Sequence, residues 1–249
     1  MLIERSMHPS WLSNSYLVAD RAGGHAVVVD TGGPAEPLLE AVARLDLTVD
    51  HVLVTHHHHD HVAENEVWRE RTGARVLCHP AEADLVADAD DTIAGGARLT
   101  VGDLQIEALH VPGHTRGQLN FLIDGSHVFT GDTLFAGSVG GTRAPGHTTF
   151  ADLRRSIMEV LMALPDETQV LPGHTEATTI GRERAENPFI RVWAGVSPEG
   201  TERCLALGEP AQLIVWADDY DGGHKAWVRF DADGEPVDDL VPGSRVERS

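Results

Sequence analysis

Residues 55–61 read Thr-His-His-His-His-Asp-His and lie between the apolar run Val52–Val54 and a helix that we expect to begin at Val62. A purification tag is found at a chain terminus and has no embedded Asp-His pair, so this interior segment does not resemble one. Neutral imidazole and carboxylate groups are the ligands that zinc, iron and manganese take in protein cavities. The segment therefore predicts a metal site at the junction of a strand and a helix.

The spacing of these side chains predicts which of them face a metal. Side chains at i and i+2 of an extended segment share a face, so His56 and His58 point to the same position. Asp60 and His61 lie where the chain turns into the helix, and they can face a second position close by. The other two histidines of the segment point elsewhere, toward second-layer contacts or solvent.

The motif Thr-His-x-His-x-Asp-His resembles the metal-binding signature of the metallo-β-lactamase superfamily, and the further elements of that signature follow downstream in the same order. Each is a candidate ligand that comes after a short apolar strand and a glycine, which lets the backbone pass close to a cavity. A single histidine after a strand is more often structural than a ligand, but three such residues in family order reverse that expectation. They are His114 in Val111–Gly117, Asp132 in Phe129–Phe135 and His174 in Val170–Thr175.

The resemblance implies a dinuclear centre with two divalent cations. One cation would be held by His56, His58 and His114, and the other by Asp60, His61 and His174, with Asp132 bridging the two. Zinc is the expected metal, with iron and manganese as alternatives, because mixed histidine and carboxylate ligands suit all three. A water between two such ions loses a proton near neutral pH and can attack a carbonyl carbon. The resemblance makes Asp60 and Asp132 the catalytic carboxylates, and Asp60 orients the nucleophile and carries a proton.

Two further stretches, Gly131–Gly140 and Pro172–Phe189, are similar to the short bacterial proteins related to hydroxyacylglutathione hydrolase, or glyoxalase II. The similarity spans about residues 10 to 190 and implies hydrolysis of a small thioester or a related acyl substrate. Relatives commonly carry Gly-Arg-x-Asp in the loop after the bridging aspartate, whereas this chain has Gly140-Gly141-Thr142-Arg143. Arg143 is a candidate contact for a substrate carboxylate, which guanidinium binds bidentately, with a solvent-facing arginine as the alternative. Full-length relatives also bind glutathione through a helical C-terminal region that is not predicted here, which leaves the thiol carrier open.

Other activities stay open at this point. A persulfide dioxygenase would use mononuclear iron held by only His56, His114 and Asp132. A lactonase or β-lactamase would use the dinuclear centre on cyclic acyl substrates. A non-catalytic, metal-stabilised binding module is disfavoured, because all seven ligand positions are filled.

Composition and charge argue against several classes of partner. Lys and Arg total 19 against 39 Asp and Glu, and the net charge of -20 disfavours binding to nucleic-acid backbones and anionic membranes. Only Cys78 and Cys204 occur, too few for a disulfide framework, and nothing at the N-terminus resembles an export signal. No apolar run approaches membrane-spanning length. We expect a soluble cytoplasmic protein with a small-molecule substrate and with neither a nucleic-acid nor a membrane partner.

The order of predicted elements indicates an α/β fold. The strand His25–Asp30, the helix Pro34–Leu45 and the strand before the histidine-rich segment form a βαβ-like unit. From Ala97 onward, short strands separated by Gly-Asp and Asp-Gly turns predict a second sheet facing the first. The superfamily fold, a four-layer αββα sandwich with metals at one edge, accommodates this order. Further helices are expected over His79–Val86 and Asp152–Leu164.

The chain is expected to divide into a catalytic domain, residues 1–195, and a small C-terminal β extension, residues 196–249. Two strands, Leu213–Ala217 and Ala226–Phe230, predict a hairpin within this extension. An isolated hairpin is marginal in water, so it should pack on the main body or on another subunit, which would make the protein a homodimer.

Overall fold

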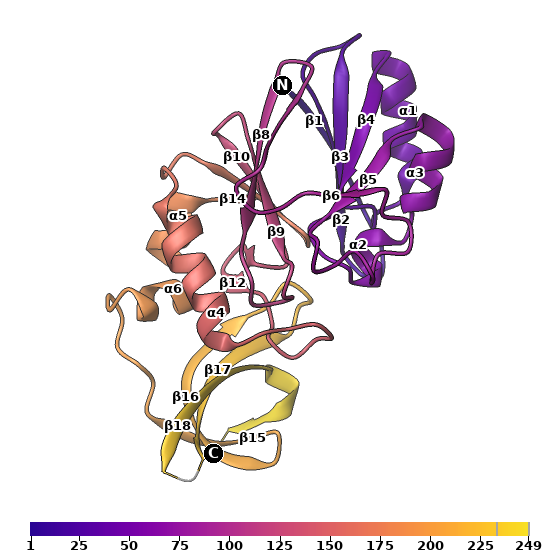
Figure 1. Cartoon of the computed structure of the whole chain (residues 1–249). Helices are drawn as coiled ribbons and strands as arrows, with labels where there is room; N and C mark the ends of the chain where they lie inside the picture. Colours follow the sequence, from indigo (N-terminus) through magenta and orange to yellow (C-terminus); the bar gives the residue numbers. More distant parts are fainter. Residues whose placement is uncertain (233, 249) are drawn as a thin grey trace.

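Two six-stranded sheets form the body of the protein (Figure 1). The computed structural model describes residues 1–232 and 234–248. The first sheet has the strand order β1-β2-β3-β4-β5-β6 and the second the order β14-β13-β10-β9-β8-β7. Helices cover the outer face of each sheet, so the layers run helix, sheet, sheet, helix (Figure 1). The predicted αββα sandwich is confirmed.

The first sheet is buried on both faces. Its run Val27-Val28-Val29 sends Val28 toward helices α1 (Ala35–Leu45) and α3 (Asn65–Thr72), and Val27 and Val29 toward the second sheet. Burial on both faces explains why this strand is continuously apolar, and β-branched residues suit the pleated surface. The strands are β1 (Leu2–Met7), β2 (Asn14–Ala19), β3 (His25–Val29), β4 (Thr48–Leu53), β5 (Arg75–Cys78) and β6 (Asp91–Thr92).

The second sheet packs on the first through Leu104, Ile106, Phe121 and Phe129, which join a buried cluster between the two sheets. Helices α4 (Phe150–Arg155), α5 (Ile180–Glu186) and α6 (Pro188–Trp193) cover its outer face. The strands are β7 (Arg98–Val101), β8 (Leu104–His110), β9 (Leu119–Ile123), β10 (His127–Gly131), β13 (Gln169–Pro172) and β14 (Thr178–Thr179). A separate two-stranded pair, β11 (Leu134–Phe135) and β12 (Ser138–Val139), follows β10.

Three helix predictions need correction. The helix expected from Val62 is divided into α2 (His59–Val62) and α3, because the chain turns at Glu64 to bond the Thr31 carbonyl. The helix expected over Asp152–Leu164 begins earlier, at Phe150, where the Thr149 hydroxyl caps it. It continues as a π turn, Ser156–Val160, and a 3-10 turn, Leu161–Ala163.

The predicted helix over His79–Val86 is wrong, since this segment forms only hydrogen-bonded turns. Its central residue, Glu82, is 1% exposed and directs its carboxylate to other loops of the body.

The C-terminal region is larger than the predicted hairpin. The two expected strands are present in β16 (Glu209–Asp218) and β17 (His224–Ala232), but they are the middle of a five-stranded sheet with the order β18-β17-β16-β15-β19. The additional strands are β15 (Glu202–Ala206), β18 (Glu235–Pro242) and β19 (Val246–Arg248). The short strand β19 pairs with β15, so the chain returns to the first strand of this sheet.

One face of the C-terminal sheet packs on the body (Figure 1). Ile214, Val215 and Trp227 belong to the same buried cluster as Phe150 of α4 and Trp193 of α6. The contact seen in this chain is therefore with its own body, whereas the domain boundary at residue 195 and a homodimer stay predictions. No helix in the described ranges is long and apolar enough to cross a membrane.

Candidate metal centre

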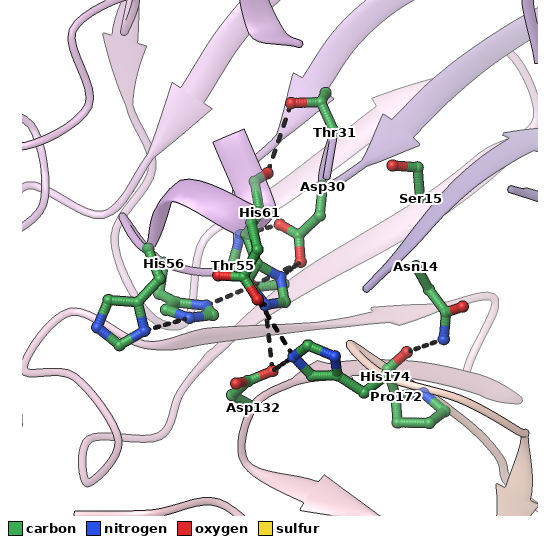
Figure 2. Close-up of polar contacts among 12 residues, drawn as sticks. Asn14, Ser15, Asp30, Thr31, Thr55, His56, His61, Asp132, Pro172 and His174 are labelled. Atoms are coloured by element: carbon green, nitrogen blue, oxygen red, sulfur yellow. Dashed lines mark hydrogen bonds and ion pairs between the residues drawn. The ribbon is translucent and has the colours of Figure 1, made fainter. Parts of the chain in front are cut away.

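The candidate ligands gather at one edge of the two sheets, and Figure 2 shows four of them, His56, His61, Asp132 and His174, turned toward one another. Strands β10 and β13 are parallel, and Gly131 pairs with Pro172, so the residues that follow them emerge side by side. The positions are His56 and His58 after β4, Asp60 and His61 in α2, His114 between β8 and β9, Asp132 after β10 and His174 after β13.

The structure brings His56, His58 and His114 together as a first group. The Nδ1 atom of His58 lies 3.0 Å from His56 Nε2 and 2.9 Å from His114 Nε2. The other ring nitrogens of His58 and His114 lie 2.9 Å from the Pro145 carbonyl and 2.8 Å from the Gly141 carbonyl. An N–H donated to a carbonyl leaves the opposite nitrogen with a lone pair, so these rings present lone pairs to one shared point.

Asp60, His61 and His174 form a second group. The Asp60 Oδ2 atom lies 3.8 Å from His61 Nε2 and 3.5 Å from His174 Nε2. The far nitrogens of the two rings are again occupied, since His61 Nδ1 is 2.9 Å from Asp30 and His174 Nδ1 is 3.0 Å from the Trp11 carbonyl. Both Nε2 atoms are therefore free to face a cation.

Asp132 lies between the groups and offers one oxygen to each. Its Oδ1 is 3.2 Å from His61 Nε2 and 3.4 Å from His174 Nε2, whereas its Oδ2 is 3.4 Å from His114 Nε2. Gly173 allows this approach, because a Cβ atom there would lie 2.6 Å from Asp132 Oδ1. This arrangement is what a bridging carboxylate requires.

Unpaired buried atoms show that divalent cations fit this donor set. His61 Nε2, His174 Nε2 and Asp132 Oδ1 are all buried, and none has a hydrogen-bond partner among the described residues. Buried polar atoms without partners are rare in native proteins. A cation between these nitrogens and this oxygen would satisfy all three.

Electrostatics distinguish the two groups. Burial lowers the pKa of His56 well below its usual range and lowers the pKa of His114 to about 4, so both rings are neutral at pH 7 and can donate lone pairs. Burial also acts to lower the pKa of His61, but the carboxylates of Asp132 and Asp30 outweigh it and raise that pKa well above its usual range. Burial acts to raise the pKa of Asp132, but His174 and His61 hold it well below its usual range. The second group is thus a place that favours positive charge.

Asp30 orients the second group and was not predicted as a site residue. Its carboxylate accepts hydrogen bonds from the Thr55 backbone N–H at 2.7 Å and the Thr55 hydroxyl at 2.8 Å, and it contacts His61 Nδ1 (Figure 2). Such a partner fixes the tautomer and direction of a ligating imidazole. An aspartate at the end of a buried strand, beside the strand that leads into the metal motif, was the available signal.

Glu82 ties together the two loops that carry the first group and was also missed. One carboxylate oxygen accepts from the His57 backbone N–H at 3.0 Å, and the other accepts from the Gly117 N–H at 2.7 Å. The His57 ring bonds the same carboxylate, so it is directed away from the first group. Burial acts to raise the pKa of Glu82, but the His57 imidazole, the Thr115 hydroxyl and the Gly117 N–H outweigh it and hold that pKa below its usual value.

We expect Glu82→Gln to weaken cation binding to the first group by about ten-fold and to destabilise the fold by about 2 kcal/mol. The amide cannot accept from both loops and bond the His57 ring as a carboxylate does. Metal titration and thermal unfolding of the metal-free protein measure the two effects. The matched control is Glu64→Gln, since Glu64 accepts one backbone bond from Ala35 on the outer face and should affect stability alone. Unchanged metal affinity in Glu82→Gln would contradict this role.

Arg143 is occupied by another part of the chain. Its guanidinium, 49% exposed, pairs with Asp239 of β18, so this ion pair links Arg143 to the C-terminal sheet.

Trp11 lies in the loop before β2 and is 39% exposed. Its ring stacks on His8 and meets the His59 ring edge-on at 5.2 Å. The loop that carries Trp11 thus supplies an exposed aromatic surface next to His174.

Comparison with known sequences supports this geometry. Residues 9–174 match the sequence model of the Metallo-beta-lactamase superfamily. An uncharacterized protein of Mycobacterium leprae is 37% identical over 203 residues, covering 71% of this chain and 93% of that protein. The hydroxyacylglutathione hydrolase of Rhodospirillum rubrum is 35% identical over 160 residues, covering 64% of this chain and 60% of that enzyme.

Solved structures give the same result. ETHE1 from Myxococcus xanthus superimposes with a TM-score of 0.68 at 32% identity, covering 79% of this chain and 92% of that one. A di-iron-bound form of TTHA1623 superimposes with a TM-score of 0.65 at 32% identity, covering 76% and 100%. The B3 metallo-beta-lactamase BLEG-1 reaches a TM-score of 0.70 at 28% identity, covering 76% and 99%.

Proposed function

Because the chain belongs to the metallo-beta-lactamase superfamily of metal-dependent hydrolases, we propose that it hydrolyses a thioester or a related small acyl substrate with two divalent cations. The observation that carries this proposal is Asp132, which offers one oxygen to each of two facing ligand groups. The similarity to hydroxyacylglutathione hydrolase favours the thioester over other acyl compounds.

The donor set proposed for one cation is His56, His58 and His114, and that for the other is Asp60, His61 and His174, with Asp132 shared. Zinc is our first choice, and iron and manganese suit the same ligands. The di-iron form of TTHA1623 makes iron a specific alternative. Two such cations, when bound, would lower the pKa of a water toward neutrality and polarise a carbonyl oxygen.

The side chains of the site have different proposed roles in excluding water and in moving a proton. Asp132 and all the ligand imidazoles except His58 are buried, so they exclude bulk water from one side of the centre. The Asp60 side chain is 30% exposed and is the carboxylate that faces the open side. We assign Asp60 to orient the attacking water and to carry its proton toward the leaving thiol, a task for which a positioned carboxylate is suited.

The structure also bears on the leaving group. Arg143 pairs with Asp239, and the C-terminal region is a β-sheet instead of the helical region that binds glutathione in the full-length enzymes it resembles. We therefore propose a thiol carrier other than glutathione. The substrate carboxylate contact expected for Arg143 would require this ion pair to open.

A substrate panel tests the proposed activity. Metal-loaded protein is assayed against S-lactoyl thioesters of several thiols, a homoserine lactone, nitrocefin and glutathione persulfide, with metal content measured on the same sample. We expect thioester hydrolysis that falls at least about a hundred-fold after chelation and returns when metal is restored, since metal supplies the nucleophile. Oxygen consumption on the persulfide with one iron per chain, and no thioester turnover, would replace the proposal by a dioxygenase.

A further inference from the structure

Tyr220 reaches the metal centre from the C-terminal sheet. It lies in the connection between β16 and β17, and its ring stacks on the His174 imidazole with centroids 4.2 Å apart and planes 15° apart. The Tyr220 ring also contacts Phe135, whose ring centroid is 4.8 Å away. A candidate ligand is thus covered by a residue far outside the matched family region.

A buried ion pair holds the connection that carries Tyr220. Lys225 is 7% exposed, and its Nζ lies 3.1 Å from Asp219 and donates to the Val139 carbonyl. The Ser138 hydroxyl donates to the same Asp219 carboxylate at 2.8 Å. Ser138 and Val139, which accept or donate these bonds on the body, form β12, shortly after Asp132 in the chain. Since breaking a buried pair leaves an uncompensated charge, this connection is held firmly against the body.

The same sheet also contacts the loop that supports the first ligand group. Asp239 of β18 accepts from the Thr142 hydroxyl at 3.3 Å and pairs with Arg143. The neighbouring Gly141 carbonyl is the group that orients His114. The C-terminal sheet therefore touches the supports of both candidate cations.

The Tyr220 hydroxyl is available to a ligand. Among the described residues it makes no hydrogen bond, although the side chain is half-buried. The ring that carries the hydroxyl stacks on the His174 imidazole, so the hydroxyl belongs to a side chain that lies against a candidate ligand.

We propose that the C-terminal sheet completes the metal centre through Tyr220, whose ring positions His174 and whose hydroxyl donates a hydrogen bond to an oxygen of the acyl substrate. The role of the hydroxyl rests on the hydrolase activity proposed above. The role of the ring does not, because it concerns metal binding alone.

Two variants of Tyr220 separate these roles. Tyr220→Phe keeps the stacked ring and removes the hydroxyl, so metal affinity should be unchanged while kcat/KM for the thioester falls about ten-fold. Tyr220→Ala removes both, and we expect affinity for the second cation to fall about ten-fold while the first is unaffected. The matched control is His224→Ala, which removes a stacked ring at the start of β17, just after the same connection, where His224 lies on Trp216 at 4.7 Å. The control should change neither quantity.

Stepwise metal titration by calorimetry measures the affinity for each cation, and steady-state kinetics measure kcat/KM. Far-ultraviolet circular dichroism verifies that each variant is folded. Wild-type metal affinity in folded Tyr220→Ala would overturn the positioning role, and wild-type kcat/KM in Tyr220→Phe would overturn the role of the hydroxyl. If the parent protein hydrolyses no thioester, the proposed function and the role of the hydroxyl fall together, whereas the titration still decides the role of the ring.

Discussion

Replacing Asp132 by Ala should lower kcat/KM on the order of a thousand-fold and reduce the bound metal from two cations to one or none. Its carboxylate lies 3.2 Å from a nitrogen of the second group and 3.4 Å from a nitrogen of the first, and no other carboxylate among the described residues faces both. Without it, each cation would lose a ligand and the pair would lose its bridge. Steady-state kinetics and elemental analysis of the purified variant measure the two effects.

The fold should survive this substitution, because Asp132 lies at the edge of the sheets and belongs to none of the apolar clusters that hold the layers together. The matched control is Asp60→Ala, which removes a carboxylate from the second group only. It should retain the first cation, whereas Asp132→Ala should weaken both. Activity of Asp132→Ala within ten-fold of the parent would remove the bridging role.

The candidate ligands could be predicted because each lies in a short sequence motif that identifies it as a metal ligand. All seven lie within short motifs whose meaning does not depend on distant parts of the chain, such as Pro-Gly-His after a strand. The layered body was predictable for a related reason, since a strand buried on both faces has a continuous apolar run, such as residues 26–29 of β3. The ligand motifs and the apolar strands can both be recognised without knowledge of tertiary contacts.

The supports of the ligands could not be predicted in the same way. Asp30 meets Thr55 only because β3 and β4 are parallel neighbours in a particular register. Glu82 lies in a segment that resembles a helix, and its function depends on two loops that come from opposite sheets. The position of Asp30 at the end of a buried strand was a signal for its role, whereas the residues around Glu82 give none.

The C-terminal sheet could be predicted only in part. Strands β16 and β17 have apolar and aromatic residues that predict a strand, whereas β18 reads Glu-Pro-Val-Asp-Asp-Leu-Val-Pro and lacks β propensity. Pairing with β17 over its whole length supplies what its composition does not. Tyr220 was missed because Asp and Gly residues around it resemble an ordinary solvent-exposed turn.

Replacing Trp227 by Ala should destabilise the protein by about 3 to 5 kcal/mol, the cost of removing a buried aromatic side chain. Trp227 is 2% exposed and contacts the Phe150 ring at 5.2 Å and the Trp193 ring at 6.2 Å, so it joins the C-terminal sheet to helices α4 and α6. Denaturant unfolding of the metal-free protein measures the loss. The matched control is Trp216→Ala in the neighbouring strand, because Trp216 packs in the small separate core of the C-terminal sheet.

The two tryptophan variants also test whether docking of the sheet and metal binding are coupled. If the sheet positions Tyr220 over His174, loosening the Trp227 contact should lower affinity for the second cation even in conditions where the body stays folded. Trp216→Ala should leave that affinity close to the parent value, because it removes no contact between the sheet and the body. Equal effects of the two variants on metal affinity would show that general loss of stability, and not the docked interface, controls the second group.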